Sequence, residues 1–151
     1  MNGRIQDKIA IITGAGAGIG EATAKKFVKE GAKVIIAEIN SESGIKVAEV
    51  INNNGGEAHF IETDVTSSSS VKSMVEKTVS IFGSPEILIN NAGIVVFDDP
   101  LKLSDEDWKK CFSVDLDGVW YGCQHTLPYM LDKKKGSIVN IASVHSTQII
   151  P

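Results

Sequence analysis

The chain has 151 residues, of which 42% are hydrophobic and 23% charged, and its formal net charge is -4. This length allows one domain with a hydrophobic core, and the composition is ordinary for a globular protein. The net negative charge argues against a nucleic acid or a membrane surface as partner. No apolar run approaches the length of a membrane span, and the two cysteines do not indicate a disulfide framework. These features predict a cytoplasmic protein.

Short apolar runs alternate with amphipathic stretches along the whole chain. Strands are predicted at KIAIIT (8–13), KVIIAEI (33–39), EAHFIET (57–63), EILIN (86–90) and SIVNIA (137–142). Helices are predicted over 18–30, 41–54, 67–82 and about 104–133. The strand runs are continuous rather than alternating, which favours burial on both faces. The order predicts an α/β fold, a doubly wound parallel sheet with helices on both faces.

Serines precede two of the predicted helices. The run Ser67–Ser70 follows an Asp-Val-Thr loop and opens the third helix, so it predicts a helix cap. Ser104 and Asp107 resemble a capping box, in which Asp replaces the usual Glu or Gln.

The first predicted strand leads into a glycine-rich segment, TGAGAGIG (13–20), which opens the first helix. Glycines let the backbone approach a pyrophosphate, and a helix N-terminus offers free N–H groups and a positive dipole end. No Lys-Ser or Lys-Thr follows, which argues against a nucleoside-triphosphate loop. The spacing is T-G-x-x-x-G-x-G rather than the common G-x-G-x-x-G. The alternative is a tight turn without a ligand.

TGAGAGIG, together with NNAG (90–93) after the fourth strand, resembles the short-chain dehydrogenase/reductase family. The resemblance implies a Rossmann-type fold, with residues 1–151 forming a single dinucleotide-binding domain that is truncated after the fifth strand. It implies hydride transfer between a nicotinamide cofactor and a small-molecule secondary alcohol or ketone. It further implies a homo-oligomer. A sugar-nucleotide epimerase is a related alternative that fits NNAG less well.

The resemblance also implies which residues bind the cofactor. They are Gly14, Gly18, Ile19 and Gly20 in the glycine loop, Glu38 at the adenosine ribose, Asp64 and Val65 at the adenine, and Asn91 and Ala92 at the cofactor ribose. Asp64 could instead cap the helix that opens at Ser67.

Glu38 closes the second predicted strand, roughly twenty residues after the glycines, where a carboxylate can accept hydrogen bonds from both ribose hydroxyls. The same carboxylate would repel a 2′-phosphate. Members of the family that prefer NADP place Arg or Lys nearby, where this chain has Ala17, Ile39 and Asn40. NAD is therefore the predicted cofactor.

The family carries its proton chemistry on Ser, Tyr and Lys, with an Asn upstream. Ser143, just past the fifth strand, matches the serine and is expected to position the substrate. The resemblance implies that the Tyr and Lys follow this serine on the next helix, beyond Pro151, and Tyr121 and Tyr129 lie on the preceding helix, in the wrong place for that role. The 151-residue chain alone is therefore expected to be inactive. A non-catalytic NAD-binding module or an assembly fragment is the alternative.

Asp115 stands where the family usually has Asn. An amide donates and accepts hydrogen bonds, whereas an ionised carboxylate only accepts. In the family role Asp115 could accept from a water or pair with the expected Lys, or it could instead serve a local role on its helix. No His, Cys or Asp cluster has the spacing of a metal site.

Overall fold

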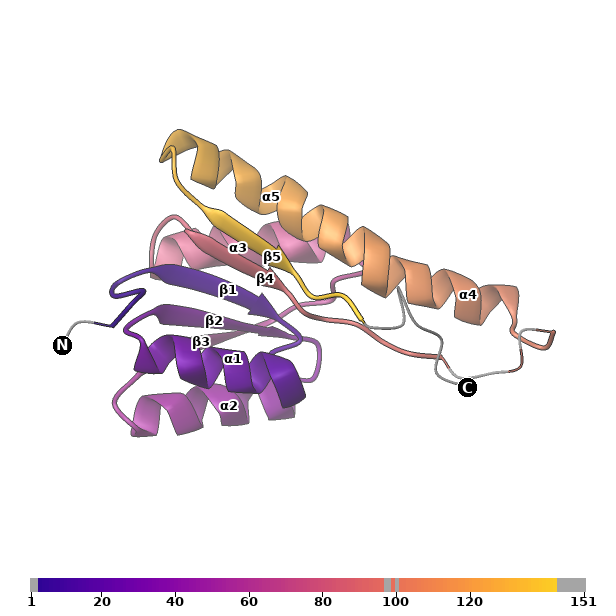
Figure 1. Ribbon diagram of the computed structural model, residues 1–151, viewed down its shortest axis with the longest axis horizontal. Coiled ribbons are helices and arrows are strands. Elements are labelled where there is room, and N and C mark those ends of the chain that lie inside the picture. Colours follow the sequence, from indigo (N-terminus) through magenta and orange to yellow (C-terminus); the bar gives the residue numbers. More distant parts are fainter. Residues whose placement is uncertain (1–2, 97–98, 100, 144–151) are drawn as a thin grey trace.

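The structure is a computed structural model that describes residues 3–96, 99 and 101–143. Its fold is a sheet of parallel strands between two layers of helices (Figure 1). Within these residues the strands of the sheet are β1 (Ile9–Thr13), β2 (Lys33–Glu38), β3 (Glu57–Glu62), β4 (Ile87–Asn90) and β5 (Ser137–Asn140). The helices are α1 (Gly18–Lys29), α2 (Ser41–Asn53), α3 (Ser68–Ile81), α4 (Asp105–Phe112), the π-helix η1 (Ser113–Asp117) and α5 (Gly118–Asp132). The predicted boundaries of the strands and first three helices are confirmed to within two residues.

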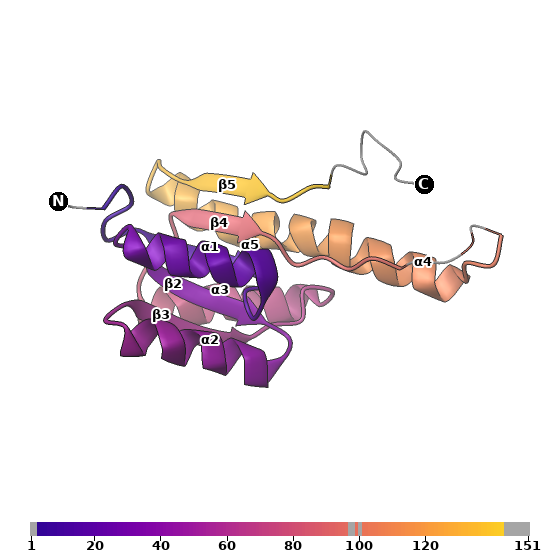
Figure 2. The same ribbon diagram turned by 60° about the horizontal axis from the view of Figure 1, so that its bottom comes forward.

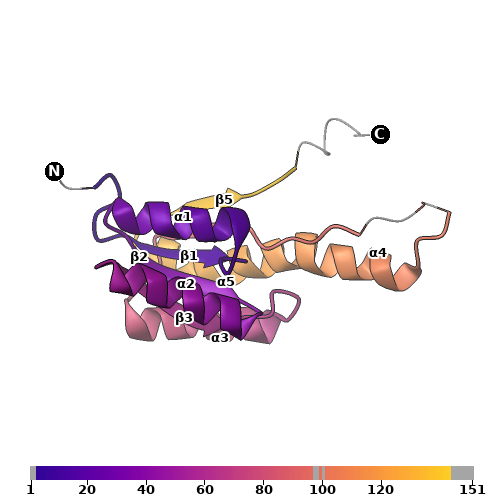
Figure 3. The same ribbon diagram turned by 90° about the horizontal axis from the view of Figure 1, so that it is seen from below.

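The sheet is doubly wound around its first strand, and all of its pairings are parallel in the order β3-β2-β1-β4-β5. Helices α1 and α2 cover one face, and α3 and α5 cover the other (Figures 2 and 3). Alternate residues of β1 pack into opposite layers. Ala10 and Ile12 belong to the core on the α1 and α2 side, whereas Ile11 packs with Met74 of α3 and Met130 of α5. The predicted α/β sheet with helices on both faces is thereby confirmed.

The two edges of the sheet are less buried than its centre. Strands β1, β2 and β4 are buried along most of their length, as their continuous apolar runs predict. In β3 only Ala58 and Ile61 are buried, and β5 is mostly exposed. Because β5 lies at the edge, its outer backbone groups face away from the described part of the sheet.

The prediction of a single helix over about 104–133 is wrong in one respect, because the π-helix η1 separates α4 from α5. A π-helix accommodates one extra residue in its turn and often marks a functional position. Here the wider turn lies beside the loop after β4, where Asp115 Oδ1 accepts a hydrogen bond from the N–H of Ile94 at 2.9 Å. Hydrophobic periodicity does not reveal such an insertion, since the segments before and after it remain helical.

Both predicted serine caps are confirmed. Ser67 Oγ accepts from the N–H of Ser70 at 3.3 Å, and Ser104 Oγ accepts from the N–H of Asp107 at 3.0 Å. The reciprocal half of the capping box is altered, because the Asp107 carboxylate accepts from the Ser104 hydroxyl at 2.7 Å. The helices therefore begin where the serines predict.

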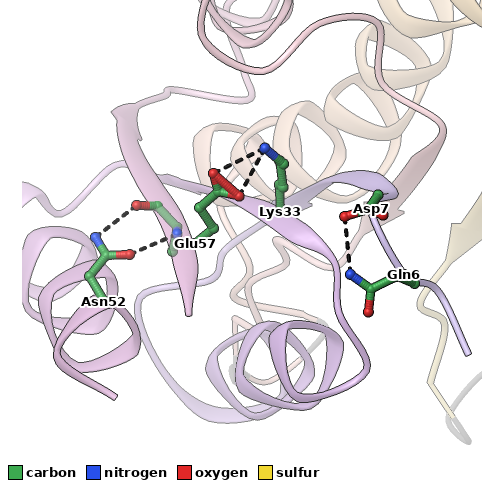
Figure 4. Close-up of polar contacts among 6 residues, drawn as sticks. Gln6, Asp7, Lys33, Asn52 and Glu57 are labelled. Carbon is green, nitrogen blue, oxygen red and sulfur yellow. Dashed lines mark hydrogen bonds and ion pairs between the residues drawn. The ribbon is translucent and has the colours of Figure 1, made fainter. Parts of the chain in front are cut away.

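Polar side chains secure the starts of β2 and β3 (Figure 4). Lys33 and Glu57, which are partners in the register of the two strands, form an ion pair with a closest distance of 2.9 Å. The Asn52 amide donates to the carbonyl of Ala58 at 2.9 Å and accepts from its N–H at 2.8 Å. This pair of bonds joins the end of α2 to β3 and fixes the turn between them.

A carboxylate between two lysines joins the starts of β1, β4 and β5. Glu86 Oε1 lies 2.8 Å from Lys8 Nζ and 2.7 Å from Lys135 Nζ, and the Glu86 side chain is only 14% exposed. Burial raises the pKa of Glu86, but the hydrogen bonds from Lys135 and Lys8 outweigh burial and hold this pKa below its ordinary value.

A lowered pKa in the folded state makes the contribution of Glu86 to stability pH-dependent. The contribution is present above the ordinary value of 4.5 and is lost as pH falls through the lower folded pKa. A Glu86→Gln variant is therefore expected to have a lower urea midpoint than wild type at pH 7, and this gap should close in acid. Glu57→Gln removes an exposed pair and serves as the control, with little expected change at either pH. A constant gap for Glu86→Gln from neutral to acid pH would contradict the assignment.

The helix α4 extends past the carboxyl ends of the strands in every view (Figures 1, 2 and 3). It buries none of its side chains. No helix of the described chain is both long and apolar enough to cross a membrane. The overhang of α4 forms one side of the site described next.

Candidate cofactor site

A cavity of about 950 Å³ lies at the carboxyl ends of the strands. Residues from five segments line it: Gly14, Ala17, Gly18, Ile19; Ala37, Glu38, Ile39; Thr63, Asp64, Val65, Thr66; Asn91, Ala92, Gly93, Ile94; and Glu106, Lys109, Lys110, Ser113, Val114. The position is the one expected for a ligand of a doubly wound sheet, where the strand order reverses between β1 and β4. The structure thus brings together all of the predicted cofactor residues except Gly20.

The glycine loop lies against the loop that follows β4. Gly14 has φ +62°, and a Cβ there would lie 2.8 Å from Ala92 Cα. Gly20 is buried beneath the loop, where an added Cβ would overlap the Gly14 carbonyl and lie 2.7 Å from Asn91 Nδ2. Gly20 therefore sets the close packing of α1 on the strand ends and does not line the cavity.

The N-terminus of α1 differs from those of α2, α3 and α4. Side chains of Asn40, Ser67 and Ser104 cap those three helices. The residue before α1 is Ala17, and no side chain of the described chain caps this helix. The N–H groups of its first turn therefore have no side-chain acceptor, and Ala17, Gly18 and Ile19 line the cavity, an arrangement that suits an anion. Ile19 and Ile39 beside it are 66% and 62% exposed, leaving apolar surface for a ligand to cover.

Two side chains tie the glycine loop to β4. The buried Thr13 hydroxyl accepts from the N–H groups of Asn91 and Ala92, both at 3.0 Å, and lies 3.4 Å from the Ile89 carbonyl. The Asn91 amide donates to the carbonyls of Thr13 at 2.9 Å and Gly14 at 3.2 Å. Asn91 thus holds the loop in place in addition to lining the cavity.

Glu38 is held at the end of β2 by backbone donors. Its Oε2 accepts from the N–H of Gly16 at 3.1 Å, and its Oε1 accepts from the N–H of Asn40 at 3.0 Å. Each carboxylate oxygen can accept more than one hydrogen bond, so capacity remains for two ligand hydroxyls. A Cβ at Gly16 would overlap Ser43 Oγ and lie 2.7 Å from Glu38 Cγ. A larger side chain at position 16 would therefore force the side chains of Ser43 and Glu38 to shift.

Asp64 and Val65 form the cavity wall after β3. Asp64 Oδ1 accepts from the N–H of Thr66 at 2.9 Å and from its hydroxyl at 2.7 Å. The alternative role as a helix cap is not seen, because Ser67 itself caps α3. Asp64 therefore shapes its own loop and presents the rest of its carboxylate to the cavity.

Neither of the two predicted catalytic residues lines the cavity. Asp115 is exposed on η1, and its bond to Ile94 ties the helix to the loop after β4. Ser143 is exposed just past β5, at the same end of the strands as the cavity. Tyr121 and Tyr129 pack against the core on the α3 and α5 side, as expected from their helix. In the described chain no cluster of three His, Cys, Asp or Glu side chains could hold a metal ion.

The sequence did not indicate the contributions of α4 and of Thr13. The lining residues of α4 and η1 recur at a spacing of three and four residues, which marks one helical face; they are Glu106, Lys109, Lys110, Ser113 and Val114. This spacing could have predicted that these side chains share one helical face. It could not have predicted which part of the protein that face lies against. Thr13 was visible as the first residue of TGAGAGIG, yet its hydroxyl gains its role only when β4 lies beside β1.

Comparison with known proteins identifies the family. The sequence model described as short chain dehydrogenase matches residues 8–151. The chain is 38% identical over 151 residues to an uncharacterized oxidoreductase of Thermotoga maritima, covering 97% of this chain and 57% of that protein. It is 39% identical over 146 residues to secoisolariciresinol dehydrogenase of Forsythia intermedia, covering 95% and 52%. It is 40% identical over 141 residues to meso-2,3-butanediol dehydrogenase of Serratia marcescens, covering 93% and 55%.

A solved structure agrees with these relatives. A crystal structure described as a short-chain dehydrogenase/reductase from Burkholderia xenovorans superposes with a TM-score of 0.93 at 34% identity, covering 97% of this chain and 60% of that one. The chain thus spans about half the length of the curated relatives it matches. The sequence match, the relatives and the shared fold show that the chain belongs to the short-chain dehydrogenase/reductase family of oxidoreductases.

Proposed function

We propose that residues 1–151 form a single dinucleotide-binding domain of an NAD-dependent oxidoreductase, which transfers hydride between nicotinamide and a secondary alcohol or ketone. The observation that carries the proposal is the cavity at the strand ends, which joins the uncapped N-terminus of α1 to Glu38, Asp64 and Asn91. The cofactor would supply the hydride chemistry. The chain would bind the pyrophosphate at α1, the adenosine between Glu38 and Asp64, and the nicotinamide half near Ala92.

The preference for NAD over NADP is assigned to Glu38. A 2′-phosphate would meet this carboxylate, and like charges in contact cost several kcal/mol. We therefore expect NADH to bind at least about a hundredfold more tightly than NADPH. Fluorescence titrations of both cofactors measure the ratio, and Glu38→Gln should narrow it.

Glu42→Gln is the matched control for this ratio. Glu42 is an exposed carboxylate in the first turn of α2, and it does not line the cavity. Its loss removes the same charge without touching the ribose site, so the preference for NADH should persist. Equal affinity of the wild-type protein for NADH and NADPH would refute the NAD assignment.

Ser143 is proposed to position the substrate oxygen, and Asp115 to take the place of the family Asn. Asp115 is already held by Ile94, which leaves its second carboxylate oxygen to accept from a water. The described lining residues include no tyrosine, and we propose that the proton donor is the family's Tyr, outside these residues. The small-molecule alcohol or ketone would enter beside Ser143.

As a separate polypeptide, the 151-residue chain is expected to bind NADH without catalysing a reaction. Turnover is checked by following NADH formation from NAD with a panel of secondary alcohols. Binding by the same preparation, measured by NADH fluorescence, is the control that its cofactor site has formed. NADH formation by this preparation would show that the chain supplies a proton acceptor of its own.

We also propose a homo-oligomer, with a second copy covering an apolar stripe along α4, η1 and α5. Trp108 and Trp120 are 55% and 62% exposed, and they share this stripe with Phe112, Leu116, Leu127 and Leu131. Within α4 an interval of four residues places Trp108 and Phe112 on one face, and within α5 intervals of seven and four residues place Trp120, Leu127 and Leu131 on one face. A cytoplasmic location is proposed on the basis that Cys111 and Cys123 are unpaired.

A further inference from the structure

The helix α4 presents a charged face to the cavity and an aromatic pair elsewhere. Glu106, Lys109 and Lys110 line the cavity. Trp108 and Phe112 do not line it, and their ring centroids lie 4.5 Å apart. The lysines therefore belong to the cofactor site rather than to the apolar stripe.

Lys109 and Lys110 are among the lysines that form no ion pair within the described residues. Ion pairs among the described residues engage seven lysines, namely Lys8, Lys25, Lys26, Lys33, Lys72, Lys102 and Lys135. Neither Lys109 nor Lys110 forms an ion pair within that part of the chain, although Glu106 lies one turn away. Their ammonium groups are exposed and not neutralised by a contacting carboxylate.

The remaining charges on the cavity wall are unfavourable for an anionic ligand. Glu38, Asp64 and Glu106 are carboxylates, and the chain as a whole has a net charge of -4. A dinucleotide brings a negatively charged pyrophosphate to this wall. Lys109 and Lys110 are the only cations among the described lining residues.

We propose that Lys109 and Lys110 attract the dinucleotide to the cavity by long-range electrostatics and so set its association rate. The inference rests on the proposed cofactor function. Charged walls of a cleft raise the association rate of an oppositely charged ligand by roughly 10-fold to 1,000-fold, and the effect falls steeply with ionic strength. The Debye length is about 30 Å at 0.01 M salt and about 3 Å at 1 M salt, so high salt should remove the attraction.

Stopped-flow mixing of the full chain with NADH at low and high salt tests the proposal. At low salt the double variant K109Q/K110Q should associate on the order of tenfold more slowly than wild type, with an unchanged dissociation rate. At high salt the two should converge. K109R/K110R keeps both charges and should retain the wild-type rate.

K133Q/K134Q is the matched control. These two lysines are also adjacent and without a described ion pair, but they lie at the far end of α5 and do not line the cavity. Their loss changes the net charge equally, so an equal slowing of association would overturn the inference in favour of a general charge effect. An unchanged K109Q/K110Q rate, or an effect on dissociation alone, would also overturn it. NADH that fails to bind wild type at all would instead refute the proposed cofactor function itself.

Discussion

We expect the free energy of unfolding of a Thr13→Val variant to be about 2–4 kcal/mol lower than that of wild type. Valine has nearly the same shape, so the packing of β1 against β4 is retained. The hydroxyl that accepts from the N–H groups of Asn91 and Ala92 is lost. The Thr13 side chain is only 3% exposed, and both hydrogen bonds are partly buried. Two unsatisfied donors account for the expected loss.

Thr13→Ser is the control for this substitution. It keeps the hydroxyl and removes a methyl group, so its loss should be the smaller of the two. Urea unfolding of both variants measures the difference, and NADH titration measures its effect on the cavity. A serine variant that is less stable than the valine variant would show that packing, rather than the shared hydroxyl, holds the loop to β4.

A Gly20→Ala variant should lose most of its affinity for NADH. The added Cβ would overlap the Gly14 carbonyl and press on the Asn91 amide, so the loop must move away from the end of β4. Overpacking of this kind costs about 1–3 kcal/mol. If this energy raises the free energy of the NADH-bound state, NADH binds roughly tenfold to a hundredfold more weakly. Isothermal titration with NADH gives the affinity directly.

Gly93→Ala provides the comparison within the same cavity. A Cβ at Gly93 would lie 3.4 Å from Asp115 Oδ1, which is an ordinary contact. This variant should keep a folded loop and most of its NADH affinity. If the two variants lose affinity equally, the crowding beneath Gly20 is not what shapes the site.

The fold was predictable because each signal for it is local. The apolar runs of β1, β2 and β4 reflect burial on both faces, and the serine caps reflect bonds within one turn. The family resemblance then placed the glycine loop, Glu38 and Asn91 at neighbouring strand ends, and the structure brings them to one cavity. Family membership is confirmed by the relatives and the shared fold.

The part of the site that could not be predicted depends on contacts between distant segments. Thr13 is an ordinary strand residue until β4 lies beside β1 and presents two N–H groups to it. The π-helix η1 lies between α4 and α5, and a π-helix holds an extra residue in its turn. Helical periodicity does not reveal such an insertion, because both flanking segments keep their own apolar pattern.

The absence of buried side chains in α4 has a consequence for motion near the cavity. The free energy needed to open a segment locally depends on how much surface the segment buries, and α4 buries no residue fully. Its backbone amides can therefore exchange with solvent through local opening, whereas β1 and β4 need a much larger unfolding event. The strand ends and the α4 residues that line the cavity thus belong to parts of the protein with different local stabilities. Helix α4 can open locally while the strand ends stay in place.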